Sequence, residues 1–209
     1  MRSYFMVKFQ LFILFLTLIY LGGCTSTKPS RFYVLSSLSS SGIEEQAEAE
    51  GLDIAIGIGP VKLPEYLDRP QIVTQSSSNE LHIGDYDRWA ENLQENFSRV
   101  LSENLSILLS TDRVFVYPWS GYTPIDYQVE IEVTQFIGKL GESTSLAVRW
   151  TIIRGDEKKV LLMQKASFTE STKTGGYKAI VAAQSKAVTS LSREIAAAIK
   201  SLSQKSYSR

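Results

Sequence analysis

The chain has 209 residues, with 22 basic and 22 acidic side chains, one histidine and one cysteine. A formal net charge of zero gives no electrostatic reason to bind nucleic acid. A single cysteine excludes a disulfide within the chain, and one cysteine with one histidine leaves too few ligands for a zinc site.

The first 23 residues have the order of a secretory signal. Arg2 and Lys8 stand before an apolar run over 9–21, and two glycines end that run. Crossing a bilayer takes about 20 apolar residues, so the run is short for a permanent span, although it could act as an uncleaved anchor. We expect residues 1–23 to be a signal peptide.

The sequence LGGC at 21–24 resembles the lipobox of bacterial lipoproteins. Small residues let the backbone enter a peptidase cleft, and the Cys24 thiol is the group that would receive a diacylglyceryl thioether. The resemblance implies cleavage before Cys24 and acylation, for example with palmitate, and more than one acyl chain gives stable anchoring. The alternative for Cys24 is a free thiol, which would be a liability in an exported protein.

What remains after removal of the signal fits one domain. It has 186 of the 209 residues, and loss of two basic side chains makes its net charge 20 − 22 = −2. Residues 24–30 are expected to form a lipidated tether, and residues 31–209 a single domain. The Ser-rich and then acidic stretch 36–51 is expected to be a mobile loop.

Alternating apolar and polar residues predict a sheet. The clearest case is 126–138, where Tyr127, Val129 and Ile131 alternate with polar residues. Short turns between the later strands favour an antiparallel arrangement. Gly57 and Gly59 indicate a bulge or a close backbone approach. The predicted strands are 31–37, 53–63, 71–75, 79–84, 113–118, 126–138, 145–153 and 160–168.

Helical spacing of apolar residues predicts two helices, over 86–110 and 176–203. Trp89 and Tyr177 begin the two apolar stripes, which we assign to the core. The expected helix starts are Asp85 or Asp87 for the first, and Thr174 or Gly175 for the second. Together these elements predict an α+β fold, a two-layer domain with a mainly antiparallel sheet packed against two amphipathic helices.

Catalytic chemistry finds little support in the sequence. His82 is the only histidine, and no nucleophile elbow, zinc-protease motif or phosphate-binding loop occurs. Glu130 and Glu132 share a strand face that solvation explains. Asn96 and Asn104 match the glycosylation pattern inside a predicted helix and are set aside. We expect no enzyme, no cofactor and no metal.

Several stretches together resemble the PqiC-type ABC-type transport auxiliary lipoproteins, and the most specific is GPVKLPEYLDRPQIV at 59–73. The resemblance implies a lipoprotein of the outer membrane that faces the periplasm. It also implies a role beside an MCE-domain transport protein and its membrane partner, in moving lipids and supporting membrane integrity. Thr25 after Cys24 fits an outer-membrane address. The other stretches are 30–37, 88–106, 116–119 and 177–199.

The loop before 71 is the expected partner contact, through Tyr66, Arg69 and Gln71, because tyrosine and arginine are enriched at interface hot spots. In the alternative interpretation Asp68 and Arg69 form a local pair and Tyr66 packs under its own loop. Trp119 is first a core candidate.

Three functions remain open. The first is a non-enzymatic accessory subunit of an envelope lipid transporter. The second is a direct lipid carrier, which needs an apolar cavity of about 300 Å³ or more between helices and sheet. The third is a purely structural envelope lipoprotein. The family analogy also implies self-association of the domain.

Overall fold

The computed structural model describes residues 4, 6, 8–10, 28–38, 52–172 and 174–207. The chain divides into two compact units, Met1–Ser30 and Arg31–Arg209. Cys24 and residues 39–51 of the predicted mobile loop lie outside the described residues. Among the helices of the described part, none has a stretch long and apolar enough to cross a bilayer.

The second unit is built on one mixed sheet whose strands differ in direction. β6, β7 and β8 form an antiparallel meander, and β3 and β4 form an antiparallel hairpin. β2 runs parallel to β5 and β6, and β1 runs parallel to β4, so the sheet is mainly but not wholly antiparallel. The strands are β1 (Arg31–Tyr33), β2 (Ile56–Lys62), β3 (Gln71–Ser77), β4 (Glu80–Trp89), β5 (Val114–Val116), β6 (Tyr127–Gly138), β7 (Ser143–Arg154) and β8 (Lys159–Ser171).

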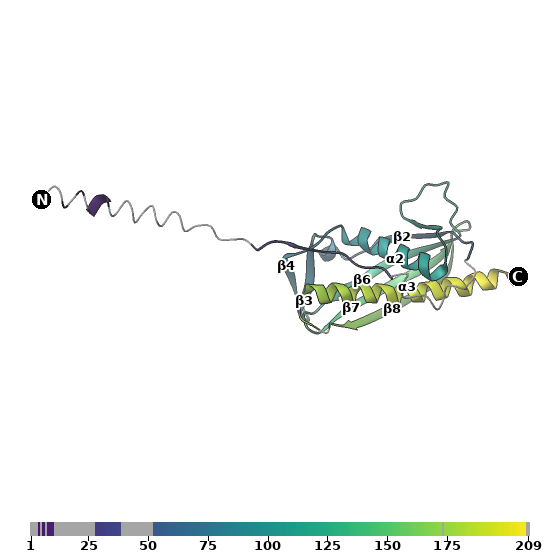
Figure 1. The fold of residues 1–209 in the computed structure, drawn as a ribbon. Helices are drawn as coiled ribbons and strands as arrows, with labels where there is room; N and C mark the ends of the chain where they lie inside the picture. The colour runs from purple at the N-terminus through teal and green to yellow at the C-terminus, as the bar shows by residue number, and fades with distance from the viewer. Residues whose placement is uncertain are drawn as a thin grey trace. The chain divides into compact units, whose positions relative to one another are not determined.

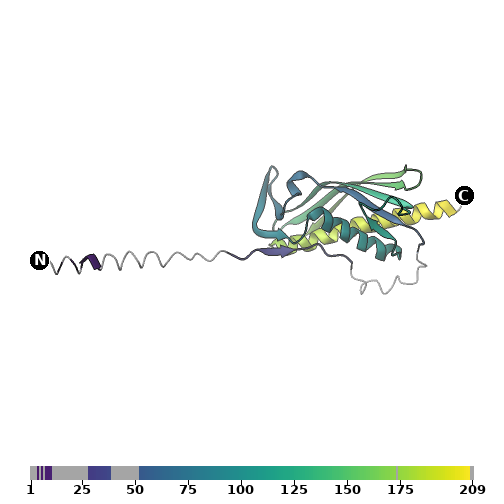
Figure 2. The ribbon, with the colours of Figure 1, turned by 90° about the horizontal axis from the view of Figure 1, so that it is seen from above.

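Two helices cover one face of this sheet, α2 (Leu93–Leu109) and α3 (Tyr177–Tyr207). Figures 1 and 2 show both helices on the same side. The layers meet in a filled core, where the Phe97 and Phe136 rings pack edge to face at 5.7 Å and Trp150 is fully buried. Such interdigitation buries the apolar face of each element. The predicted two-layer α+β architecture is confirmed.

The predicted start of the first helix is wrong. β4 continues to Trp89, and α2 begins only at Leu93, with the Asn92 side chain accepting the backbone N–H groups of Gln94 and Glu95. Asp87 therefore caps no helix. Trp89 is a core residue as predicted, at 5% exposure, but it lies on a strand.

Smaller differences concern the ends of other elements. The strand predicted over 31–37 ends at Tyr33, because the residues that follow bond to helix side chains instead of a neighbouring strand. The loop predicted before residue 71 contains a short 3₁₀ helix, η2 (Glu65–Leu67). The second helix begins at Tyr177 rather than at Thr174 or Gly175.

β6 connects two ends of the domain. Near its start it pairs with β2, and its last residue, Gly138, pairs with Thr74 of β3. Its twelve residues span about 36 Å at strand rise. We call the region of β1, β3 and β4 the β1 end, and the region of residues 117–126 and 154–158 the cleft end.

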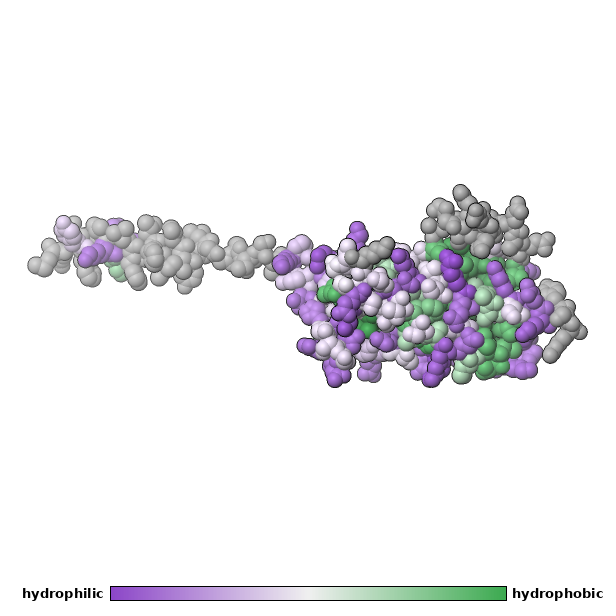
Figure 3. Space-filling view, turned by 90° about the horizontal axis from the view of Figure 1, so that it is seen from below, coloured by the Kyte–Doolittle hydropathy of each residue, from purple (hydrophilic) through white to green (hydrophobic). Residues whose placement is uncertain are grey.

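The sheet has a long exposed edge at β8. This strand pairs only with β7, none of its residues is buried, and Val160 and Met163 are more than half exposed. Figure 3 shows hydrophobic surface gathered toward the C-terminal side of the face seen from below. Lys159 and Lys165 lie on the same strand, and edge lysines are a common protection against unwanted strand pairing.

Candidate functional site

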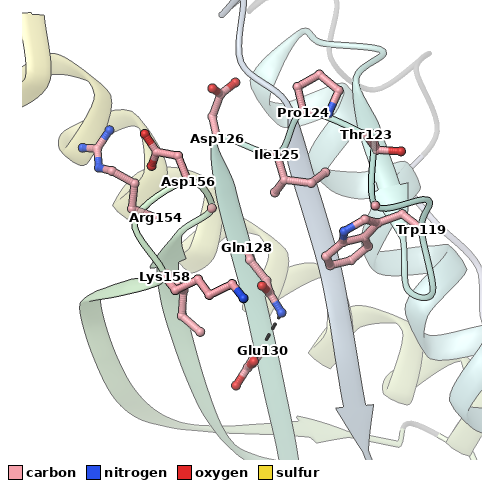
Figure 4. Close-up of a pocket in the computed structure, with 13 residues that line it drawn as sticks. Trp119, Thr123, Pro124, Ile125, Asp126, Gln128, Glu130, Arg154, Asp156 and Lys158 are labelled. Carbon is pink, nitrogen blue, oxygen red and sulfur yellow. Dashed lines mark hydrogen bonds between the residues drawn. The ribbon is translucent and has the colours of Figure 1, made fainter.

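A cleft of about 710 Å³ opens at the cleft end, and Figure 4 shows its lining side chains. Trp119 and the residues that follow it form one wall, the first residues of β6 form the floor, and the turn between β7 and β8 forms the other wall. The lining residues are Trp119, Gly121, Thr123, Pro124, Ile125, Asp126, Gln128, Glu130, Ile153, Arg154, Gly155, Asp156 and Lys158.

Two glycines of β2 hold the first wall in place. A Cβ on Gly57 would lie 2.8 Å from the Trp119 ring, and one on Gly59 would lie 2.8 Å from the Tyr117 Cβ. Only glycine lets these residues approach so closely, and Gly59 also has a φ of +119°. The two rings pack edge to face at 5.5 Å. The close approach predicted for Gly57 and Gly59 is confirmed, as is a register shift after Ile58.

Some polar groups on the floor already form hydrogen bonds within the protein. The Asp126 carboxylate accepts the Ala55 backbone N–H at 2.6 Å, and the Gln128 amide donates to the Gly59 carbonyl at 2.9 Å. The same amide nitrogen lies 3.2 Å from Glu130 Oε1. The Glu130 carboxylate is thus held facing the cleft, while Asp126 fixes the start of β6 against β2.

The other wall supplies positive charge. Lys158 points across the cleft toward Gln128 and Glu130 (Figure 4). Arg154 lies over the Tyr127 ring, 5.6 Å from its centroid, a cation–π arrangement that orients the guanidinium. The cleft therefore presents carboxylates on its floor and cations on the wall beside it, opposite the wall that carries the Trp119 ring.

The residue types that line the cleft are mainly charged, amide, aliphatic and aromatic. The cleft lining contains no histidine, cysteine or serine, and His82 lies on β4 at the β1 end. Among the described residues, no group of three or more histidine, cysteine and acidic side chains could hold a metal ion. Mixed charges around a Trp ring fit a polypeptide segment better than an acyl chain.

The predicted contact residues Tyr66, Arg69 and Gln71 do not line this cleft. Tyr66 is half-buried against the core, and burial raises the pKa of its hydroxyl. Arg69 is half-buried too, and its Nε has no hydrogen-bond partner within the described residues. Gln71 opens β3 and lies opposite Arg88 of β4, so this loop belongs to the β1 end.

The alternative interpretation, in which this loop stabilises itself, agrees with the structure for Tyr66 but not for Asp68 and Arg69. Tyr66 packs against the core as that interpretation requires. Asp68 instead accepts a hydrogen bond from the Asn92 amide at 3.3 Å, and no ion pair between Asp68 and Arg69 occurs in the described range 52–172.

A second feature went unnoticed in the sequence. Residues 31–38, which we call the strap, bond to side chains of both helices. The Leu35 and Leu38 backbone N–H groups donate to Asn96 and Asn104 of α2, both at 2.7 Å, and the Ser36 N–H donates to Ser185 of α3 at 3.0 Å. Asn96 and Asn104 are fully buried, and their spacing of two helical turns on an apolar face was the available signal.

A buried carboxylate fixes the start of the strap. Asp87, at 4% exposure, accepts hydrogen bonds from Arg31 Nη2 and from the Tyr33 hydroxyl, both at 2.8 Å. Burial, together with the bond to Asp87, raises the pKa of Tyr33, and burial raises the pKa of Tyr177 nearby. The bond to Asp87 raises the pKa of Arg31.

Fold and site define an α+β domain with a polar cleft and a strapped N-terminal segment. The chain belongs to the family of ABC-type transport auxiliary lipoprotein components, whose model matches residues 33–196. The match covers the strap from Tyr33 onward, the loop before β3, the cleft and most of α3. No curated protein sequence matches the chain.

Solved structures share the fold. A DUF330 protein from Xanthomonas campestris superposes with a TM-score of 0.70 at 13% identity, over 86% of this chain and 100% of that one. A second crystal structure, of an uncharacterised protein, gives a TM-score of 0.66 at 18% identity, over 82% of this chain and 99% of that one. At such identities the likeness establishes the fold alone.

Proposed function

We propose that this protein is a non-enzymatic, lipid-anchored subunit of an envelope lipid transport system. The carrying observation is the family match over 33–196, together with the lipobox-like sequence at 21–24. In this proposal residues 1–23 are a signal peptide, 24–30 a tether acylated at Cys24, and 31–209 one domain. The anchor lies in the outer membrane and the domain faces the periplasm.

The proposed partner is an MCE-domain transport protein with its membrane partner, and the complex moves lipids and supports membrane integrity. The cleft receives a polar segment of that partner, because its charged floor and wall and the Trp119 ring offer both ion pairs and aromatic packing. Arg69 and Gln71 form a second contact, with Tyr66 supporting the loop from below. Loops carried by a rigid sheet are common binding elements.

A direct lipid carrier is the second candidate, but the filled space between the helices and the sheet argues against it. Phe97, Trp150 and Leu191 are fully buried where helices and sheet meet, so the space that an acyl chain would need is filled. The cleft exceeds about 300 Å³ in volume, the minimum expected of a ligand pocket, but five of its lining residues are charged. A purely structural lipoprotein remains the third candidate, and the experiment below distinguishes it from a transport subunit.

The test is recovery of partners with the tagged full-length protein from gently solubilised envelopes. Wild type and Cys24→Ala are compared, and a Glu130→Lys, Lys158→Glu double variant reports on the cleft. We expect an MCE-domain protein with the wild type, at several detergent strengths, and less of it with either variant. Recovery of the lipoprotein alone under all conditions would contradict the proposal and favour a structural role.

A further inference from the structure

The β1 end carries one group of exposed hydrophobic side chains. Within residues 28–38, 52–172 and 174–207, eleven large hydrophobic side chains are classed as exposed. Five of them are on β1, directly after it, or on β4: Phe32, Val34, Leu81, Ile83 and Tyr86. Their exposed fractions run from 38% to 64%. Contiguous exposed hydrophobic side chains are typical of interaction sites.

The strand pairing brings part of this set together. Phe32 lies opposite Arg88 in the parallel pair of β1 and β4, and Tyr86 is two residues before Arg88 on the same strand. Residues two apart on a strand share a face, so Phe32 and Tyr86 are diagonal neighbours about 7–8 Å apart. Leu81 and Ile83 share a face further along β4 for the same reason.

The short tether between Cys24 and Arg31 determines what the β1 end faces. Only six residues separate Cys24 from Arg31, and at full extension they reach about 25 Å. Arg31 and the strap are fixed to the domain by Asp87, Asn96 and Asn104, so they cannot extend the tether. The reach of the tether is shorter than the span of β6, about 36 Å. An anchored Cys24 therefore keeps the β1 end next to the lipid surface.

We propose that Phe32, Val34, Leu81, Ile83 and Tyr86 form a membrane-contact face that dips into the lipid interface beside the anchor. The inference rests on the proposed lipid anchor at Cys24, and it adds a second, non-covalent contact that sets the orientation of the domain. The cleft then points away from the membrane, toward a periplasmic partner.

Charge plays the smaller part in this contact. Arg88 has no ion-pair partner within the described residues, and Arg31 is exposed but paired with Asp87. Glu80 and Asp85 lie on the same hairpin, and their negative charges are repelled by an anionic lipid surface. Apolar insertion should dominate, so the contact is expected to change little with ionic strength.

A single introduced cysteine can report on this contact. Cys24 is the only cysteine, and a thioether at Cys24 would consume its thiol, so a new thiol is labelled alone in the lipidated protein. Phe32→Cys and Leu81→Cys probe the proposed face, and Met163→Cys on β8, at 60% exposure against 64% for Phe32 and 44% for Leu81, is the control. Each carries an NBD fluorophore in vesicles of phosphatidylethanolamine and phosphatidylglycerol, with or without brominated acyl chains.

We expect brominated lipid to quench the labels at residues 32 and 81 about twofold and to leave the label at 163 unchanged, since interfacial insertion reaches about 5–10 Å. Adding Leu81→Asp and Ile83→Asp to the Phe32→Cys protein should abolish the quenching. Equal quenching at all three positions, or none at any, would overturn the proposed face.

Flotation of the same vesicles separates the two proposals. If the full-length protein floats with the lipid but the labels at 32 and 81 are not quenched, the anchor stands and the contact face is wrong. If the protein does not float, the anchor at Cys24 is wrong, and the contact face falls with it.

Discussion

The strap and the loop over 117–126 are both irregular segments, but they are held in different ways. The strap is fixed through its backbone, with N–H groups accepted by Asn96, Ser185 and Asn104. The loop is fixed at its two ends, where the Tyr117 N–H donates to the Ile58 carbonyl at 2.9 Å and the Asp126 N–H donates to the Ala55 carbonyl at 2.8 Å, while Tyr122 at its tip is 97% exposed. A segment that is bonded along its length has little freedom to move, whereas a loop that is bonded at its two ends leaves its tip adaptable.

This difference fits two tasks at opposite ends of β6. A segment that connects the domain to an anchor must hold its position, and buried amide groups provide that. A segment that meets a partner gains from a free tip on a rigid base. The following substitutions test each half of the comparison, and their effects on stability should decrease in the order given.

Asn96→Leu should have the largest effect. It leaves the buried Leu35 N–H without an acceptor, which should lower the free energy of unfolding by about 2–3 kcal/mol. Urea unfolding followed by tryptophan fluorescence measures the change. Gln94→Ala, at an exposed position of the same helix, is the control and should change stability by less than about 0.5 kcal/mol. Equal effects of the two variants would show that the strap is not held by Asn96.

Gly57→Val should come next, at about 1–2 kcal/mol, because the new side chain collides with the Trp119 ring. The ring must leave the sheet, so the cleft wall should open while the β1 end stays intact. Hydrogen exchange should rise at residues 117–126 and stay unchanged in the strap. Gly121→Ala, where a Cβ would meet nothing within 4 Å, is the control. Faster exchange in the strap as well would refute the independence of the two ends.

Tyr33→Phe should cost about 1 kcal/mol near neutral pH, because it removes one hydrogen bond to Asp87. It should also change the response to alkali. The folded-state pKa of Tyr33 is raised above the unfolded value of about 10, so its contribution is present below pH 10 and is lost as pH rises through the folded pKa. Urea midpoints measured across that range should fall less steeply in Tyr33→Phe than in the wild type. The pKa of Tyr177 is also raised, so its ionisation should still make the urea midpoint of the variant fall with pH. Identical slopes would contradict the assignment.

Tyr122→Ser should have the smallest effect on stability, below about 0.5 kcal/mol, since the side chain is almost fully exposed. A larger loss in urea unfolding would show that the tip is part of the packed structure and would weaken the comparison with the strap.

Much of the fold was predictable because its periodicity is local. The alternation over 126–138 matches β6, with Tyr127, Val129 and Ile131 buried. The start of α2 was missed because Trp89 happens to stand at helical spacing from Leu93. Asn92, followed three residues later by Glu95, carried the correct signal for a helix N-terminus.

The sites were harder to predict, because they depend on contacts between distant segments. The cleft joins Trp119, the start of β6 and the turn after β7, and no local pattern links them. The bond from Leu35 to Asn96 spans 61 residues, and in the sequence Asn96 matched only a glycosylation pattern. Gly57 and Gly59 were the exception, since two glycines in a strand already predict a close approach.

Site-specific photo-crosslinking in living cells tests the account most directly. A benzophenone amino acid replaces Tyr122 in one version of the full-length protein and Leu81 in another. The account predicts that the probe at 122 captures a protein of the transport system, and that the probe at 81 captures lipid and no protein. Protein captured from 81 and none from 122 would contradict the assignment of the two ends.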